Sequence, residues 1–197
     1  MGSSPSQFIS KGDFSSLDGL YYRFQRSHDV VRLFRVLKSI LDRFGCLGAM
    51  LRHFYEGDTR DMIWQVRQEF LRNEEGLTFF FPKPSASNPM KRWNLLLRWM
   101  VRKDGIDIGL WDFIPKDSLV MPLDIHLFKI GRCLGWIQRK NPSWKAACEL
   151  TDALRVFSPE DPLRYDFFLC QRVGIADGCT GSRTAACFGK CLLMSNG

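Results

Sequence analysis

NPMKRWNLLLRWMVRK (residues 88–103) has the features of a helix start followed by a helix with an apolar face. Asn88 is a favoured N-cap residue and Pro89 suits the first helical position, so we predict a helix over 89–103. Lys91 then lies in the first turn, where the helix end carries partial positive charge and a cation is disfavoured. Either the Lys91 side chain simply points into water, or this unfavourable placement serves a purpose.

The rest of the chain also has helical periodicity. Between residues 30 and 44 apolar side chains recur at i, i+3, i+4 and i+7, and Gly45 can close that helix. Residues 77–87 break the pattern with prolines and serines, which indicates an ordered loop. We therefore predict an all-α fold, with a single helical domain over 1–175 and an irregular cysteine-containing tail over 176–197. Further helices are predicted at 47–56, 60–73, 125–134, 143–156 and 162–171.

Composition and net charge limit the cellular compartment and the binding partners that we expect for this chain. The chain has 197 residues, of which 45% are hydrophobic and 25% charged, enough for one well-packed domain. No apolar run approaches the roughly 18 residues of a membrane-spanning helix, and MGSSPSQFIS lacks the profile of a secretory signal, so we expect a cytoplasmic protein with no membrane partner. The net charge of +7 suits a polyanion such as nucleic acid, although a moderately basic enzyme with solvated arginines explains it equally well.

A second helix start lies in MPLDIHLFKIGRCLG (121–135). Pro122 keeps Met121 extended and the apolar pattern begins just after Asp124, which predicts Asp124 as an N-cap. The helix dipole and the backbone N–H groups would hold its carboxylate ionised. A fixed carboxylate in a cleft can stabilise a developing cation or orient a nucleophile, and capping alone is the alternative role.

Lys91 is the candidate nucleophile. A lysine at a helix N-terminus beside Arg92 has its charged form disfavoured, and a Schiff-base nucleophile must react as the neutral amine. The alternative is an exposed lysine without a chemical role. Three widely spaced histidines give little support to a histidine-based metal site.

Three blocks of the sequence resemble known families. PLDIHLFKIGRCLG (122–135) resembles the Asp-Thr-His stretch of helix-hairpin-helix DNA glycosylases, in which the aspartate is catalytic. Together with FPKPSASNPMKRWNLLLRWMVRKDGIDIGLW (81–111) and SPEDPLRYDFFLCQRVGI (158–175), it resembles the DUF2400 family of bacterial proteins over most of residues 5–175. That family resembles a divergent branch of the glycosylases, closest in spacing to the archaeal 8-oxoguanine glycosylases. The resemblance implies a helix-hairpin-helix glycosylase-like helical domain that lacks some N-terminal helices of the family.

The resemblance also implies roles for individual residues. Lys91 matches the Schiff-base lysine and Asp124 the activating carboxylate of a DNA-repair glycosylase and AP lyase that acts on a damaged, oxidised base. The usual hairpin signature, Leu-Pro-Gly-Val-Gly, is absent, and SASNPM stands before the lysine. We expect a monomer that binds damaged duplex DNA in the nucleoid and requires no cofactor. Expected DNA contacts come from Asn88, Arg92, Arg98, Arg102, His126 and Lys129. The alternatives are a non-catalytic nucleic-acid-binding domain and an inactive truncated member of the family.

Four of the seven cysteines lie in the last 28 residues. Without a secretory signal, such a cluster favours a metal or iron–sulfur site over disulfides. CTGSRTAACFGKCLLMSNG (179–197) resembles the iron–sulfur loop of many of these glycosylases, but Gly197 stands where the last cysteine would fall. The expected ligand set for a [4Fe-4S] cluster or zinc is therefore Cys170, Cys179, Cys187 and Cys191. A degenerate tail that holds no metal is the alternative.

Overall fold

The computed structural model describes residues 4–72, 75–182, 184–187 and 191–193. In these residues helices are the only regular elements apart from two isolated β-bridges, which confirms the predicted all-α class. The chain packs as two compact units, Met1–Lys83 and Pro84–Gly197, and the division into a helical domain over 1–175 and a tail over 176–197 stays a prediction. None of the helices in the described part of the chain is both long and apolar enough to span a bilayer.

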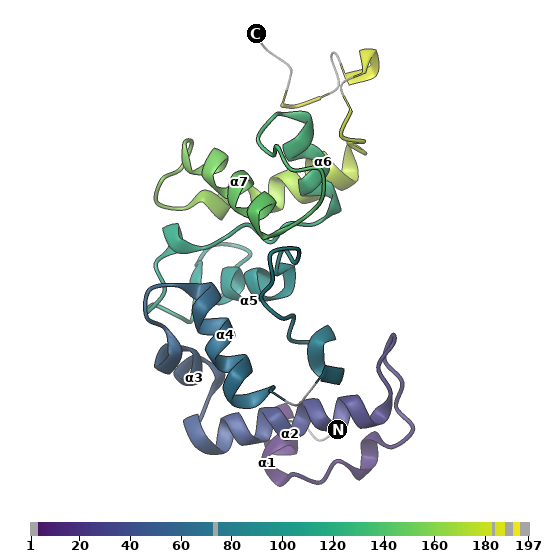
Figure 1. The fold of residues 1–197 in the computed structure, drawn as a ribbon, viewed down its shortest axis with the longest axis vertical. Coiled ribbons are helices and arrows are strands. Elements are labelled where there is room, and N and C mark those ends of the chain that lie inside the picture. The colour runs from purple at the N-terminus through teal and green to yellow at the C-terminus, as the bar shows by residue number, and fades with distance from the viewer. Residues whose placement is uncertain (1–3, 73–74, 183, 188–190, 194–197) are drawn as a thin grey trace. The chain divides into compact units, whose positions relative to one another are not determined.

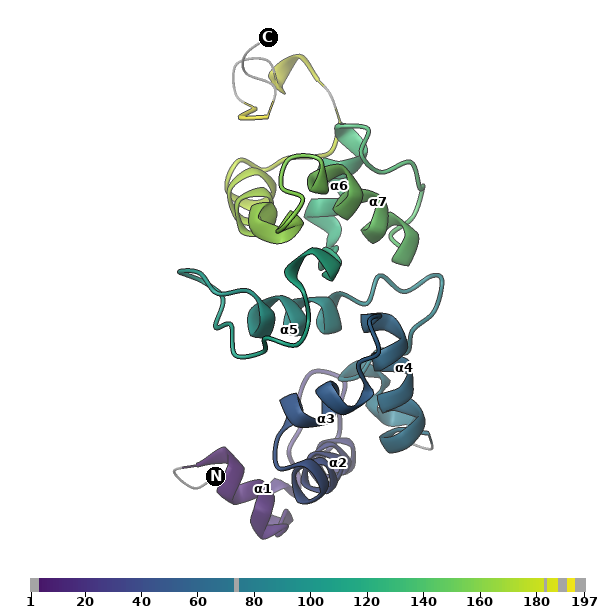
Figure 2. The ribbon, with the colours of Figure 1, turned by 90° about the vertical axis from the view of Figure 1, so that its left-hand side faces the viewer.

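The first unit is built around one long helix. Its helices are α1 (Pro5–Lys11), α2 (Ser27–Phe44), α3 (Leu47–Phe54) and α4 (Thr59–Phe70), with short 3-10 turns at Ser15–Leu17 and Glu75–Phe79. Gly45, in a left-handed conformation with φ of 77°, ends α2 as predicted. Figures 1 and 2 show α1 lying against α2 and α3 beside α4.

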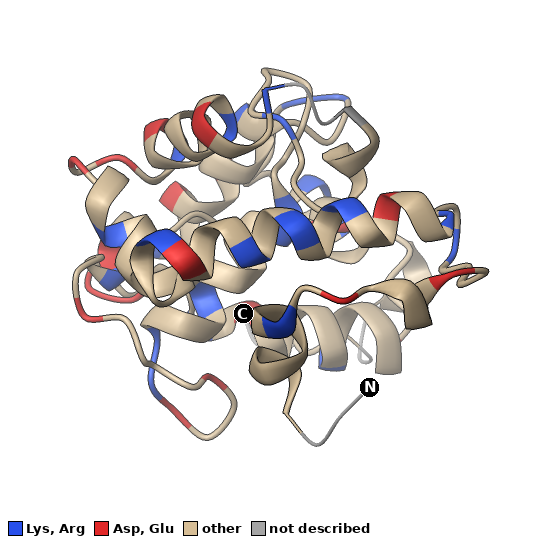
Figure 3. Cartoon of the chain, turned by 90° about the horizontal axis from the view of Figure 1, so that it is seen from below, with Lys and Arg blue, Asp and Glu red and all other residues tan. Residues whose placement is uncertain are grey.

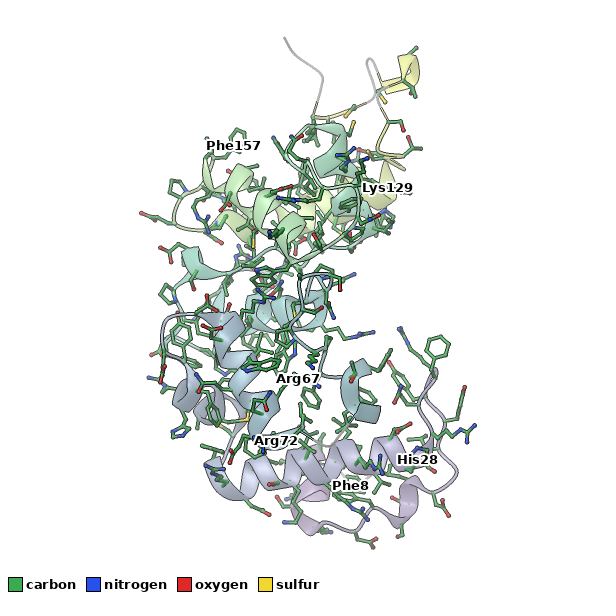
Figure 4. All side chains as sticks on the ribbon, viewed as in Figure 1. Phe8, His28, Arg67, Arg72, Lys129 and Phe157 are labelled. Atoms are coloured by element: carbon green, nitrogen blue, oxygen red, sulfur yellow. The ribbon has the colours of Figure 1, made fainter. Side chains whose placement is uncertain are left out.

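An aromatic cluster joins α1 to α2 in this unit. Phe8, labelled in Figure 4, packs its ring edge-on against Phe34 with 5.5 Å between the ring centroids. Phe14 completes the cluster against both rings, and Leu17 and Val30 are buried with it. Burial of this apolar surface is what holds the short helix α1, which is too short to be stable alone.

The predicted loop over 77–87 is anchored to α4 at its start. Leu77 is fully buried, and Arg67 on α4 donates a hydrogen bond from Nη1 to the backbone oxygen of Phe81. Arg67 is itself buried, and that burial lowers the pKa of its guanidinium. Because a buried arginine satisfies the loop backbone, the segment is ordered despite its prolines.

The second unit holds α5 (Lys91–Val101), α6 (Ile125–Cys133) and α7 (Trp144–Arg155). A single helix was predicted over 162–171; the chain instead forms a 3-10 turn at Pro162–Tyr165 and a π-helix, η5, at Phe168–Ala176. A π-helix closes i→i+5 bonds, so a pattern search at 3.6 residues per turn does not reveal it.

The π-helix η5 packs closely on α6. A Cβ added to Gly174 would lie 2.7 Å from the Cβ of His126, closer than real Cβ contacts allow. Because glycine has no Cβ, the backbone of η5 at Gly174 can lie directly against the His126 side chain of α6. The approach brings the side chains of η5 to the start of α6, where Asp124 lies.

Candidate functional site

Lys91 is the first residue of α5, because the local backbone delays the helix by two positions. Asn88 was predicted as the N-cap, but its Oδ1 accepts the N–H of Met90 at 2.8 Å in a turn that precedes the helix. Met90 follows in a left-handed conformation with φ of 58° and is the actual N-cap. The predicted start is therefore wrong by two residues, and the correction moves Lys91 from inside the first turn to its very beginning.

Asp124 is the N-cap of α6, as predicted. Its Oδ1 accepts the backbone N–H of Leu127 at 2.9 Å. Its other oxygen, Oδ2, lies 3.4 Å from the Lys91 Nζ and 3.3 Å from the Cys170 Sγ, whose thiol donates to it. The structure thus brings the two predicted catalytic residues together, and the two helix starts meet at one carboxylate.

The surroundings keep the Asp124 carboxylate ionised. Burial by itself raises its pKa, but the Leu127 N–H, the Cys170 thiol and the positive charge of Lys91 outweigh that effect, and the pKa lies below its ordinary value. The carboxylate therefore carries its negative charge at neutral pH. It can stabilise a cation beside it.

A pocket of about 710 Å³ opens at this pair. Beside Lys91 and Asp124, its wall includes the polar side chains of Arg98, His126, Asp166, Cys170 and Gln171. Its rim is apolar and largely exposed, and is formed by Trp99, Ile106, Ile125, Phe167 and Ile175. A few convergent polar groups in an apolar pocket are typical of small-molecule sites.

Asp166 gives this pocket a second carboxyl with different behaviour. Burial, together with the nearby charges of Asp124 and Asp107, raises the pKa of Asp166 to about 6 although Arg98 pairs with it. One pocket therefore contains a carboxylate that stays ionised and a carboxyl that changes charge near neutral pH. Such a separation of two carboxyl groups is typical of sites that transfer protons.

Arg98 and Arg102 lie in buried ion pairs and not on the exposed basic surface from which the sequence expectation started. Both are buried, with side chains only 6% exposed, and both bind Asp107. Arg98 also pairs with Asp166, and Arg102 with Asp104 and Asp161. A guanidinium that is buried among carboxylates has its charge satisfied within the protein.

The other expected DNA contacts lie at or near the surface of the second unit. Arg92 is exposed at the start of α5, and Asn88 is half-buried in the preceding turn. His126 lines the pocket. Lys129 is exposed on α6, where it is labelled in Figure 4, and Gly181 packs against its Cβ. These four remain candidates for contacts to a polyanion.

The cysteines predicted as metal ligands do not form a metal site in the described residues. No three His, Cys, Asp or Glu side chains there are grouped so that they could hold an ion. Cys170 donates to Asp124, whereas Cys187 contacts the backbone oxygen of Ser182 and the hydroxyl of Thr184. The arrangement of the described residues therefore does not fit a four-thiolate site.

Sequence reasoning missed two residues of the site. Cys170 was assigned to the metal set, and Asp166 received no role, although the two lie one helical turn apart in the block DPLRYDFFLC (161–170). The resemblance of that block to the family was the only sequence signal that could have pointed there. The block carries no local motif, because its function depends on contacts to a helix far away in the sequence.

The Cys170 thiol should be unreactive compared with that of Cys187. Burial and the hydrogen bond to the Asp124 carboxylate raise the pKa of Cys170 to about 12, whereas the hydrogen bond with Thr184 lowers the pKa of Cys187. Since only the thiolate reacts, iodoacetamide at pH 8 should modify Cys187 well before Cys170, as measured by peptide mass spectrometry over time. Asp124→Asn removes the negative charge and should accelerate modification of Cys170. Equal rates at Cys170 in the two proteins would contradict the contact.

Comparison with known proteins identifies a family for this chain. A family model described as "Protein of unknown function (DUF2400)" matches residues 1–176. No curated protein and no solved structure matches the chain. The matched region includes α5, α6 and η5, and so all the residues that line the pocket. The chain belongs to the DUF2400 family.

Proposed function

We propose that this chain is a DNA glycosylase with AP lyase activity that removes a damaged base through a Schiff base on Lys91. The observation that carries the proposal is the 3.4 Å separation between the Lys91 Nζ and the Asp124 Oδ2 at the mouth of a pocket. The predicted nucleophile and its predicted partner come from helices that are distant in sequence. A chance pairing of exposed side chains would not account for a pocket that also converges on them.

The geometry suits the chemistry of such a reaction. Asp124 pairs with the ammonium form of Lys91 and holds it at the pocket, and the proton that Lys91 must lose before it attacks carbon passes to water. The neutral amine forms a bond to the sugar C1′ as the bond from C1′ to the base breaks. The ionised carboxylate stabilises the positive charge that develops on the sugar. The C1′–O4′ bond of the sugar then breaks, which gives an imine at C1′. Loss of a C2′ proton to water then drives β-elimination, in which the bond from C3′ to the phosphate oxygen breaks and the phosphate leaves with the bonding electrons.

The pocket has the properties needed by a planar aromatic ligand. Trp99 and Phe167 are large exposed side chains at its rim, and a base extruded from a duplex is stabilised by stacking on such rings. Gln171, His126 and Asp166 supply hydrogen-bonding groups in the wall. Arg92 and Lys129 are the exposed cations of this unit that we assign to the flanking phosphates.

Borohydride trapping tests the proposal directly. The protein is mixed with a labelled duplex that carries one abasic site or one 8-oxoguanine, and borohydride reduces any imine to a stable covalent adduct. We expect an adduct, and peptide mass spectrometry should place the modified residue at Lys91. An undamaged duplex is the control and should give no adduct.

The other outcomes distinguish the alternatives. An adduct on another lysine would leave a lyase but reject Lys91 as its nucleophile. Binding that weakens with salt, without any adduct, would instead support a non-catalytic nucleic-acid-binding domain. Absence of both adduct and binding would reject the proposed function for this chain.

A further inference from the structure

A turn in the first unit exposes an unusual run of large apolar side chains. Tyr21 is 67% exposed, Tyr22 51% and Phe24 81%, and Leu20 beside them is also exposed. Single exposed aromatics are common on protein surfaces, but several within five residues form a patch. Such patches on soluble proteins are typical of interaction sites. Figure 1 shows this segment, between α1 and α2, extending beyond the start of α2.

The turn is held in a fixed conformation. Tyr22 donates its N–H to the Gln25 backbone oxygen at 3.0 Å, and Gln25 returns the bond to Tyr22 at 2.9 Å. Between them Arg23 adopts a left-handed conformation with φ of 55°, which is costly for a residue other than glycine. Gln25 is buried and anchors the turn to the unit. The aromatic side chains are thus presented by a built turn, at the expense of backbone strain.

Most of the charged side chains around the patch are basic, although Asp18 and Asp29 also lie near it. Arg23 and Arg26 are both exposed, and the Arg23 guanidinium lies 5.8 Å from the centroid of the Tyr22 ring. The adjoining helix α2 carries further basic residues along its length, which Figure 3 shows as blue bands. A groove of about 570 Å³ in the same unit is lined by His28, Arg32 and Arg35 from α2. The patch and its surroundings therefore combine stacking surfaces with positive charge.

We propose that the turn 20–26 is a nucleic-acid contact in which Phe24 and Tyr21 stack on unpaired bases while Arg23 and Arg26 contact phosphates. Aromatic rings beside cations are what sequence-tolerant binding of single strands requires, because every base has a stacking face and every nucleotide a phosphate. A membrane surface also accepts aromatic and basic side chains. The arginines favour nucleic acid, because their planar guanidinium groups stack on bases as well as pairing with phosphates.

This surface is independent of the chemistry proposed for Lys91 and is tested without it. The full chain is titrated into a fluorescently labelled, undamaged single-stranded oligonucleotide, and the dissociation constant is measured by anisotropy at several salt concentrations. Phe24→Ala should weaken binding about tenfold, the usual effect of losing one stacked base. Lys145→Gln, at an exposed position outside both the pocket and the turn, should bind like the unmodified protein. Because the oligonucleotide is undamaged, failure of the glycosylase proposal would leave this result unaffected.

Two further variants test whether the loss of binding comes from stacking at Phe24, from the charge of Arg23, or from the loss of any exposed phenylalanine. Arg23→Gly removes the guanidinium and suits the left-handed backbone, so it should keep the turn while reducing the slope of log K against log salt by about 0.7, as expected for one lost phosphate contact. Phe157→Ala removes an exposed phenylalanine from the other unit, labelled in Figure 4, and should bind normally.

Unchanged DNA affinity in Phe24→Ala and Arg23→Gly, with the circular dichroism spectrum intact, would overturn the proposal. If the same variants also bind more weakly to vesicles of phosphatidylserine and phosphatidylcholine, the turn is assigned to a membrane surface instead. If the circular dichroism spectrum of Phe24→Ala is altered, the DNA affinities of Arg23→Gly and Tyr21→Ala decide the question.

Discussion

Lys91→Gln is expected to abolish the borohydride adduct, lowering its rate of formation by roughly 10³-fold or more. Glutamine keeps much of the length and polarity of lysine but has no nucleophilic amine. The Asp124 carboxylate keeps its bonds to the Leu127 N–H and the Cys170 thiol, so the variant should retain the fold of the pocket. The measurement is single-turnover trapping on abasic-site DNA, followed on a denaturing gel.

Lys145→Gln is the matched control for this variant. Lys145 is also exposed and also lies in the first turn of a helix, α7, but it does not line the pocket. Its replacement removes the same charge and the same kind of amine, and the adduct should form at the rate of the unmodified protein. Equal adduct in Lys91→Gln and the unmodified protein would refute Lys91 as the nucleophile.

Local sequence signals predicted the ends of several elements well. Gly45 ends α2 and Asp124 caps α6, because a left-handed glycine and a capping carboxylate act through the backbone within a few residues. The prediction that Asn88 caps α5 was wrong for a related reason. Its side chain does bond the backbone, but in a turn before the helix, and the sequence offers no means to tell that turn from a cap.

Which residues form the pocket depends on contacts between distant parts of the chain, and the helical periodicity of the sequence does not reveal such contacts. Arg98 belongs to a stretch that reads as basic surface, yet its partners Asp107 and Asp166 lie 9 and 68 residues away. Cys170 reads as a metal ligand from its position in a cysteine cluster, yet it donates to a carboxylate 46 residues earlier. The pairing of Lys91 with Asp124 was anticipated through the family resemblance, and no local pattern would have given it.

The buried arginine pairs make a second strong prediction. Asp107→Asn should lower the free energy of unfolding by about 3–5 kcal/mol, the usual result of removing one partner from a buried ion pair. The Asp107 side chain is 0% exposed, and its Oδ2 accepts from Arg98 at 3.1 Å and from Arg102. Asparagine keeps the shape of the side chain but supplies no negative charge, so the two buried guanidinium groups lose the carboxylate that they share. Urea unfolding followed by circular dichroism measures the change.

Asp152→Asn provides the comparison that makes this result specific. Asp152 also pairs with an arginine, Arg155, but its side chain is 66% exposed, and its loss should cost less than about 1 kcal/mol. If Asp107→Asn proves as stable as Asp152→Asn, then water or the remaining carboxylates satisfy the arginines and the pairs do not hold the unit together. If it is strongly destabilised, Arg98 is fixed by Asp107, and the position of Asp166 in the pocket depends on that same pair. The carboxyl that changes charge near neutral pH would then be placed by a structural network, and conditions that weaken the network should alter the pocket before they unfold the chain.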